Sequence, residues 1–219
     1  MRGLNRTTIG TCLLASWLAV GLIGAQSEAA DGHSLGAWVS REHEFLRRYQ
    51  AVIRQGAHDY QYDYQTPRLI IPIIVELFRN YVVAIHEIEE QVLYPPLRER
   101  MNAAQQKQLS LLLHDQQVES VTVQALQRNL EVYEQTQGSK AEIADSADYL
   151  ASMINRHVVM QQQLIVPLLD QLTNPEQIRL MAQIEERERR ALGSPGRRLA
   201  EQLLEYIEQQ ITLLVGRLW

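Results

Sequence analysis

Apolar residues recur at three- and four-residue spacing along most of the chain, which is the period of an α-helix with one buried face. This pattern predicts four long helices, over residues 35–56, 67–100, 103–137 and 139–173, and two shorter ones over 175–191 and 197–217. Glycine and proline lie near their ends or bends. No segment alternates with the period of a β-strand. We therefore expect an all-α fold, an antiparallel up-down four-helix bundle with two additional C-terminal helices.

The N-terminal segment has the pattern of a secretory signal peptide. Arg2 and Arg6 precede an apolar run of 17 residues over 9–25, and small and polar residues follow. Because that run is at the short limit for a membrane span, cleavage is favoured over an uncleaved membrane anchor. Contact with a membrane is expected only if the segment is not cleaved. The sequence thus predicts a signal peptide over 1–27, a helical bundle over 33–172 and a helical extension over 173–219, with export to a bacterial periplasm.

Composition excludes several classes of function. The 219 residues include 26 acidic and 21 basic ones, and the basic residues form no one-sided run, which argues against binding to nucleic acid. The single cysteine, Cys12, lies in the predicted signal peptide, so the mature protein has neither a disulfide nor a thiolate metal site. Any metal must be held by nitrogen and oxygen. Phosphate-binding glycine loops and a Ser-His-Asp arrangement are not found.

Four histidines are spaced as a repeat, with one in each predicted long helix. They are separated by 43, 28 and 43 residues and are His43, His86, His114 and His157. The offset of 71 residues that relates His43 to His114 also relates His86 to His157, Glu90 to Gln161 and Pro96 to Pro167. We interpret the repeat as two related helical hairpins packed face to face, which brings the four histidines together.

The histidines and a nearby acid have the spacing of a metal site. His86 and Glu90 are four residues apart, so both side chains are expected on one helix face, about one turn apart. Imidazole together with carboxylate favours a first-row transition metal over calcium or magnesium. A lone histidine on a helix is usually a surface or core residue, whereas four in a repeat indicate shared ligation.

The segments around these histidines resemble a known family. REHEFLRRY, HEIEEQVLYPPL, LLHDQQVES and HVVMQQQLIVPLL are similar to the hemerythrin-like family, the HHE cation-binding domain, over about residues 33–172. The resemblance implies an up-down bundle around a non-heme centre of two iron ions that binds dioxygen, nitric oxide or iron itself. It also implies that Glu90 bridges the metals and that the nitrogen ligands are His43, His86, His114 and His157.

The sequence departs from the family pattern at one ligand position. Gln161 stands where the second glutamate is expected, and it offers a neutral oxygen without negative charge. The missing charge should weaken one metal or require another anion. Glu89 and Glu119 are the nearest acids that could supply it, although their pattern favours solvated helix surfaces. Val118 occupies the position of a further histidine found in oxygen-carrying members.

The expected metal ligands are therefore His43, His86, Glu90, His114, His157 and Gln161. The sequence predicts an exported metal-binding protein with a non-heme, di-iron centre that binds or senses oxygen or nitric oxide, or stores iron. Another first-row metal could replace iron. This pattern favours binding over catalysis. Two alternatives stay open: a di-iron enzyme of the peroxidase or oxidase type, and a metal-free helical interaction module.

Overall fold

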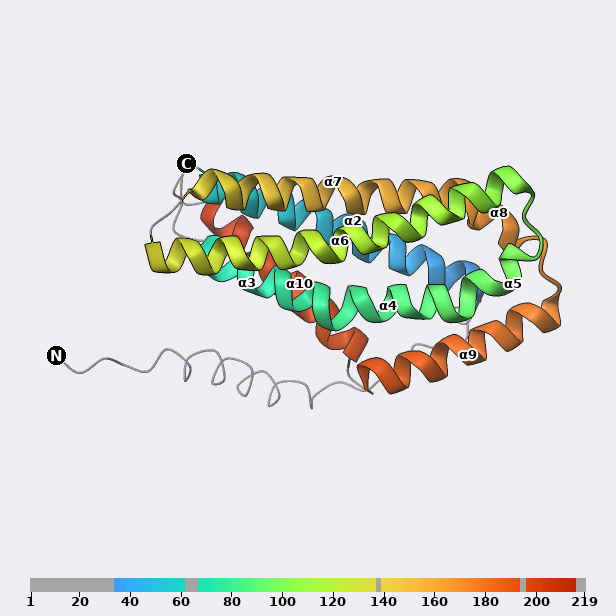
Figure 1. Cartoon of the computed structure of the whole chain (residues 1–219). Coiled ribbons are helices and arrows are strands. Elements are labelled where there is room, and N and C mark those ends of the chain that lie inside the picture. Colours follow the sequence, from blue (N-terminus) through green and yellow to red (C-terminus); the bar gives the residue numbers. More distant parts are fainter. Residues whose placement is uncertain (1–33, 62–66, 137–138, 194–195, 216–219) are drawn as a thin grey trace, which may run out of the picture. The chain divides into compact units, whose positions relative to one another are not determined.

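The computed structural model describes residues 34–61, 67–136, 139–193 and 196–215 (Figure 1). The predicted signal peptide over 1–27 lies outside these residues. Within the described ranges the regular structure is entirely helical, which confirms the predicted fold class. None of the described helices is both long enough and apolar enough to cross a membrane.

The long helices follow the predicted order. The first is α2 (Leu35–Gln61). The second consists of α3 (Pro67–Leu77), η2 (Phe78–Val82), α4 (Val83–Ile88), η3 (Glu89–Leu93) and α5 (Tyr94–Arg98), where η marks a π-helical segment. The third is α6 (Ala103–Thr136), and the fourth is α7 (Lys140–Leu164) with α8 (Val166–Leu169). The extension contains α9 (Asn174–Leu192) and α10 (Gly196–Val215).

The helices pack as a bundle around one apolar core. α7 packs along both α2 and α6, and the second helix contacts α2 through α3 (Figure 1). Residues from all four long helices are buried in this core, among them Trp38, Phe78, Leu112 and Ile154. In the extension, α9 contacts α4 and η3, and α10 contacts α2. The polar cluster described below lies within this packed interior.

The first helix is longer than predicted. α2 continues past Gly56, where the sequence pattern placed its end, and reaches Gln61. Gly56 is buried, and a Cβ atom at this position would lie 3.5 Å from the side chains of Ile70 and Ile74 in α3. The glycine therefore marks the place where α3 packs against α2, and the helix does not end there.

Buried charge attaches the C-terminal helices to the bundle. Arg197 of α10 forms an ion pair with the carboxylate of Glu42 in α2, which is 1% exposed. Arg197 also lies 3.4 Å from Glu188 of α9, which accepts a hydrogen bond of 2.7 Å from Trp38 Nε1. Tyr81 donates a hydrogen bond of 3.0 Å to Glu42. Burial raises the pKa of Glu42 to about 7 even though Arg197 opposes the shift.

We predict that Arg197→Met lowers the free energy of unfolding by about 3 kcal/mol, because it leaves the buried Glu42 carboxylate without its cation. The matched control is Arg198→Met, at an exposed neighbouring position on the same helix. This control should change stability by no more than about 0.5 kcal/mol. Urea unfolding followed by circular dichroism measures both, and equal losses in the two variants would contradict the proposed anchoring.

Candidate metal centre

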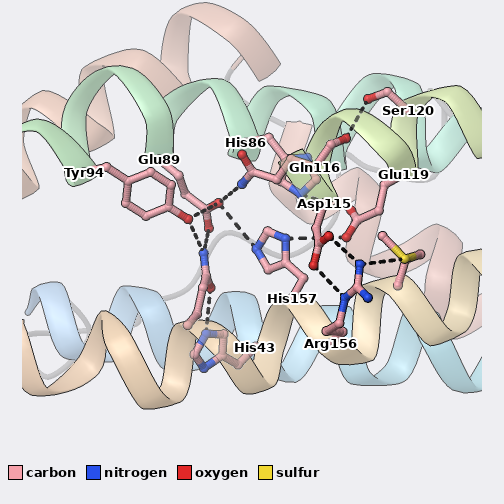
Figure 2. Close-up of polar contacts among 12 residues, drawn as sticks. His43, His86, Glu89, Tyr94, Asp115, Gln116, Glu119, Ser120, Arg156 and His157 are labelled. Atoms are coloured by element: carbon pink, nitrogen blue, oxygen red, sulfur yellow. Dashed lines mark hydrogen bonds and ion pairs between the residues drawn. The ribbon is translucent and has the colours of Figure 1, made fainter. Parts of the chain in front are cut away.

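A cluster of polar side chains lies in the interior, where the four long helices meet (Figure 2). Its members come from α2, α4, η3, α6 and α7, and each is at most 7% exposed: His43, His86, Glu89, Gln116, Glu119, His157 and Gln161. Polar groups in a packed interior lose water, so each needs a partner from the protein or a ligand. The partners of each atom therefore show what the cluster could hold.

Glu89 is held by three hydrogen-bond donors. The amide Nε2 of Gln161 donates to Oε1 at 2.7 Å, and the amide Nε2 of Gln116 donates to Oε2 at 2.8 Å. The Tyr94 hydroxyl donates to Oε2 at 3.0 Å and accepts from Gln161 Nε2 at 2.6 Å (Figure 2). Donors from three helices thus fix the position of this carboxylate.

His43 reaches the cluster through Gln161. Its Nε2–H donates a hydrogen bond of 2.8 Å to Gln161 Oε1. The amide nitrogen of Gln161 already donates to Glu89 and to Tyr94, so its oxygen must face His43. The Nε2 of His43 therefore carries a proton, and burial lowers the pKa of this histidine, which favours the neutral imidazole.

His86 and His157 face the two buried glutamates. Their rings are stacked, with centroids 4.9 Å apart, and Figure 2 shows His157 between Glu89 and Glu119. His157 Nε2 lies 3.6 Å from Glu89 Oε2, and its Nδ1 lies 3.6 Å from Glu119 Oε1. His86 Nε2 lies 3.6 Å from Glu119 Oε2. These separations exceed the length of a hydrogen bond.

Four atoms of these residues are buried without a hydrogen-bond partner. They are His86 Nε2, Glu119 Oε1, and both ring nitrogens of His157. One ligand atom each from His86, Glu89 and His157 lie within 4.8 Å of one another, so one ion could contact all three. Imidazole nitrogen with carboxylate oxygen suits a first-row transition metal. The donor chemistry and the unpartnered atoms both fit a metal ion.

The two glutamates dominate the electrostatics of the cluster. Burial opposes a charged His157, but interactions with Glu119 and Glu89 outweigh it and raise the pKa of His157 to about 10. Burial also opposes the charge on Glu89, but His157, together with His86 and Gln161, lowers its pKa to about 2. His86 has a lowered pKa because burial is the largest effect on it. Without a metal, His157 is the cation that compensates the carboxylates.

The family model for the hemerythrin HHE cation-binding domain matches residues 35–169. The chain belongs to this family. The resemblance seen in the sequence is therefore confirmed. Comparisons with curated proteins and with solved structures give no significant match.

The hemerythrin domain brings together part of the predicted ligand set. His43, His86, His157 and Gln161 all lie in the buried cluster. The other two predicted residues, Glu90 and His114, are exposed, so the expectation that they share the interior with the rest needs correction. Glu89 and Glu119 were expected on solvated surfaces, yet each is 1% exposed.

Glu89 is buried in place of the predicted Glu90 for a geometric reason. The buried face of α4 and η3 includes Ile85, Ile88 and Val92, and Glu89 lies at its centre. His86 is nearer the edge of that face, so the residue four positions later falls outside it.

On α6, Glu119 is buried and the predicted His114 is exposed because of the register of this helix. Its buried residues recur at alternating steps of three and four and include Leu109, Leu112, Gln116, Glu119, Val123 and Leu126. This series passes through Gln116 and Glu119 and omits His114. The signal was present in the sequence, because the apolar members of the series define the inward face. The histidine repeat pointed to the wrong face of this helix.

We predict that metal-free protein loses stability as the pH rises from about 7 to about 9, in part through His157. Its pKa is 6.5 when unperturbed and about 10 in the fold, so the bound proton stabilises the fold fully below pH 6.5. That contribution is lost as the pH rises through the folded value. The measurement is the free energy of unfolding of chelator-treated protein across this range.

His157→Gln is the comparison variant for this prediction, because it removes the titrating group. The decline between about pH 7 and 9 should be smaller in this variant than in the wild type. Equal slopes in the two proteins would show that His157 does not hold a proton between the two carboxylates.

Proposed function

We propose that this hemerythrin domain holds iron in the buried cluster and uses it to bind dioxygen or nitric oxide. The observation that carries the proposal is the set of buried atoms without hydrogen-bond partners on His86, His157 and Glu119, beside the fixed carboxylate of Glu89. A packed interior rarely leaves several such atoms together unless a ligand satisfies them.

The surroundings of the cluster support a small ligand in preference to a large substrate. His157 is 0% exposed, and Glu89 and Glu119 are each 1% exposed. A molecule that reaches an ion among these residues has to pass between packed helices, which favours a diatomic gas. Iron supplies reversible coordination of such a gas when it is bound there, and the mixed nitrogen and oxygen donors suit it.

We further propose that the protein acts outside the cytoplasm, in the periplasm of a bacterium. This part of the proposal rests on the order of charged, apolar and small residues over 1–30 of the sequence. Fractionation of cells and mass spectrometry of the purified protein test it. Loss of residues up to about Ser27 supports export, whereas an intact N-terminus in the cytoplasmic fraction contradicts it.

We predict that His86→Gln lowers the affinity for ferrous iron by about tenfold or more, because it removes a buried nitrogen donor. His114→Gln makes the same chemical change at an exposed residue that the sequence repeat had also nominated. This second variant should bind iron as the wild type does. Anaerobic titration with ferrous iron, followed by metal analysis after gel filtration, measures both.

The same preparations separate the competing functions. Purified wild type without iron, zinc or manganese above background, and without affinity for them, would contradict the proposal. A reversible change in the absorption spectrum on exposure to oxygen or nitric oxide supports ligand binding. Turnover of peroxide that is lost in His86→Gln would instead assign the protein to an enzyme class.

A further inference from the structure

We infer that the cluster is built for one metal ion, held by His86, Glu89 and His157, and that Gln161 prevents the binding of a second. This inference rests on the proposed function, since it concerns the same site. It differs from what the family resemblance implies, which is a pair of ions with His43 and residue 161 among the ligands.

Three donors converge and are available to an ion. Ligand atoms of His86, Glu89 and His157 lie within 4.8 Å of one another, and the ring nitrogens of the two histidines that face the cluster have no hydrogen-bond partner. Two imidazoles and one carboxylate form a ligand set that is typical of mononuclear ferrous centres with open coordination positions. This set is complete without a residue from α2.

Glu119 is placed to orient the imidazole ring of His157. His157 presents Nε2 toward Glu89 and Nδ1 toward Glu119 Oε1, each at 3.6 Å. Metal-bound histidines commonly direct their second ring nitrogen at a carboxylate, which fixes the tautomer and the ring orientation. With Nε2 on the metal, the Nδ1–H of His157 would be directed at Glu119. We therefore treat Glu119 as a positioning residue.

The donors expected at a second ion are engaged with each other. The Nε2 of His43 is engaged in a hydrogen bond to Gln161 Oε1, whereas the ring nitrogens of His157 have no such partner, so an ion would have to break this bond to reach His43. Gln161 cannot rotate its oxygen toward a metal without turning its amide nitrogen away from Glu89 Oε1 and Tyr94. Both potential ligands are thus held in a hydrogen-bonded pair.

Glu89 also lacks the acceptor capacity of a bridging carboxylate. A carboxylate has about four acceptor positions, and Gln161, Gln116 and Tyr94 occupy three of them. The remaining position serves one metal bond. A bridge between two ions needs a free position on each oxygen, whereas Oε2 already accepts from both Gln116 and Tyr94.

The charge of the interior also matches a single divalent ion. The described residues include four buried acids, of which Glu42 is paired with Arg197 and Asp115 with Arg156. Glu89 and Glu119 remain, and one divalent cation balances their two charges. A second cation would leave excess positive charge in a medium that solvates it poorly.

The decisive experiment is the stoichiometry of metal binding in the full chain. Anaerobic titration with ferrous iron, monitored by calorimetry and by metal analysis, should give one ion per chain for the wild type. Manganese-loaded protein should give the electron paramagnetic resonance signal of an isolated ion, and the intensity of this signal should account for all of the bound manganese. Two ions per chain, or the weakened signal of a coupled pair, overturns the inference.

Gln161→Glu tests the reason for this stoichiometry. A carboxylate at position 161 cannot donate to Glu89 Oε1, and it supplies the negative charge and the anionic oxygen that a second ion needs, so the variant should bind two ions per chain. Gln162→Glu is the matched control, because it makes the same change at the adjacent, exposed residue of α7 and should still bind one. Circular dichroism confirms that both variants are folded.

The outcomes distinguish failure of the inference from failure of the proposed function. A wild type that binds no ion contradicts the proposed function itself. A wild type that binds two ions preserves the proposed function and overturns only the single-ion site. If the wild type and Gln161→Glu both bind one ion, the role assigned to Gln161 is overturned.

Discussion

The centre of the bundle depends on the burial of two carboxylates that form no ion pair with an arginine or lysine among the described residues. Glu89 and Glu119 are as deeply buried as the leucines around them. A buried carboxylate is very costly unless it is paired with a cation or supported by several hydrogen bonds. The other two buried acids of the described fold meet this requirement with Arg197 and Arg156. At the centre, a cation has to come from a proton or from a metal.

His157 connects these two possibilities. In the absence of metal it lies between both carboxylates, and their charge raises its pKa to about 10, so it serves as the internal cation. A metal ion that takes its Nε2 must displace a proton, which makes metal affinity depend on pH. Protonation and metal binding therefore compete for one position, and either keeps the buried glutamates compensated. The stability of the bundle and the occupancy of the site are coupled for this reason.

The sequence predicted the fold more accurately than the site. Most helix boundaries follow from apolar periodicity, although α8 ends at Leu169 and not near residue 173. The end of α2 was misplaced because a glycine buried against Ile70 resembles a helix terminus in the sequence. The histidine repeat nominated His43, His86 and His157, and these three lie together in the buried cluster. It failed at His114, because equal spacing along the chain does not ensure an equal position on each helix face. On α6 the apolar register would have identified Glu119.

The error at Glu90 has a different origin. A step of four residues keeps the second side chain in the interior only when the first one lies near the centre of the buried face, whereas His86 lies near the edge of the face formed by Ile85, Ile88 and Val92. In α7, which is regular over this stretch, His157 and Gln161 are both buried at the same four-residue step.

The replacement of a glutamate by Gln161 is better explained as a change in the design of the site than as its decay. A residue left over from a lost metal site would be expected to have unsatisfied polar atoms or to be replaced by an apolar one. Gln161 instead uses its oxygen and both amide hydrogens, with His43, Glu89 and Tyr94 as partners. The unpartnered atoms are found on His86, His157 and Glu119. Since Gln161 completes its own hydrogen bonds and holds Glu89 in place, it supports the proposed ligand set.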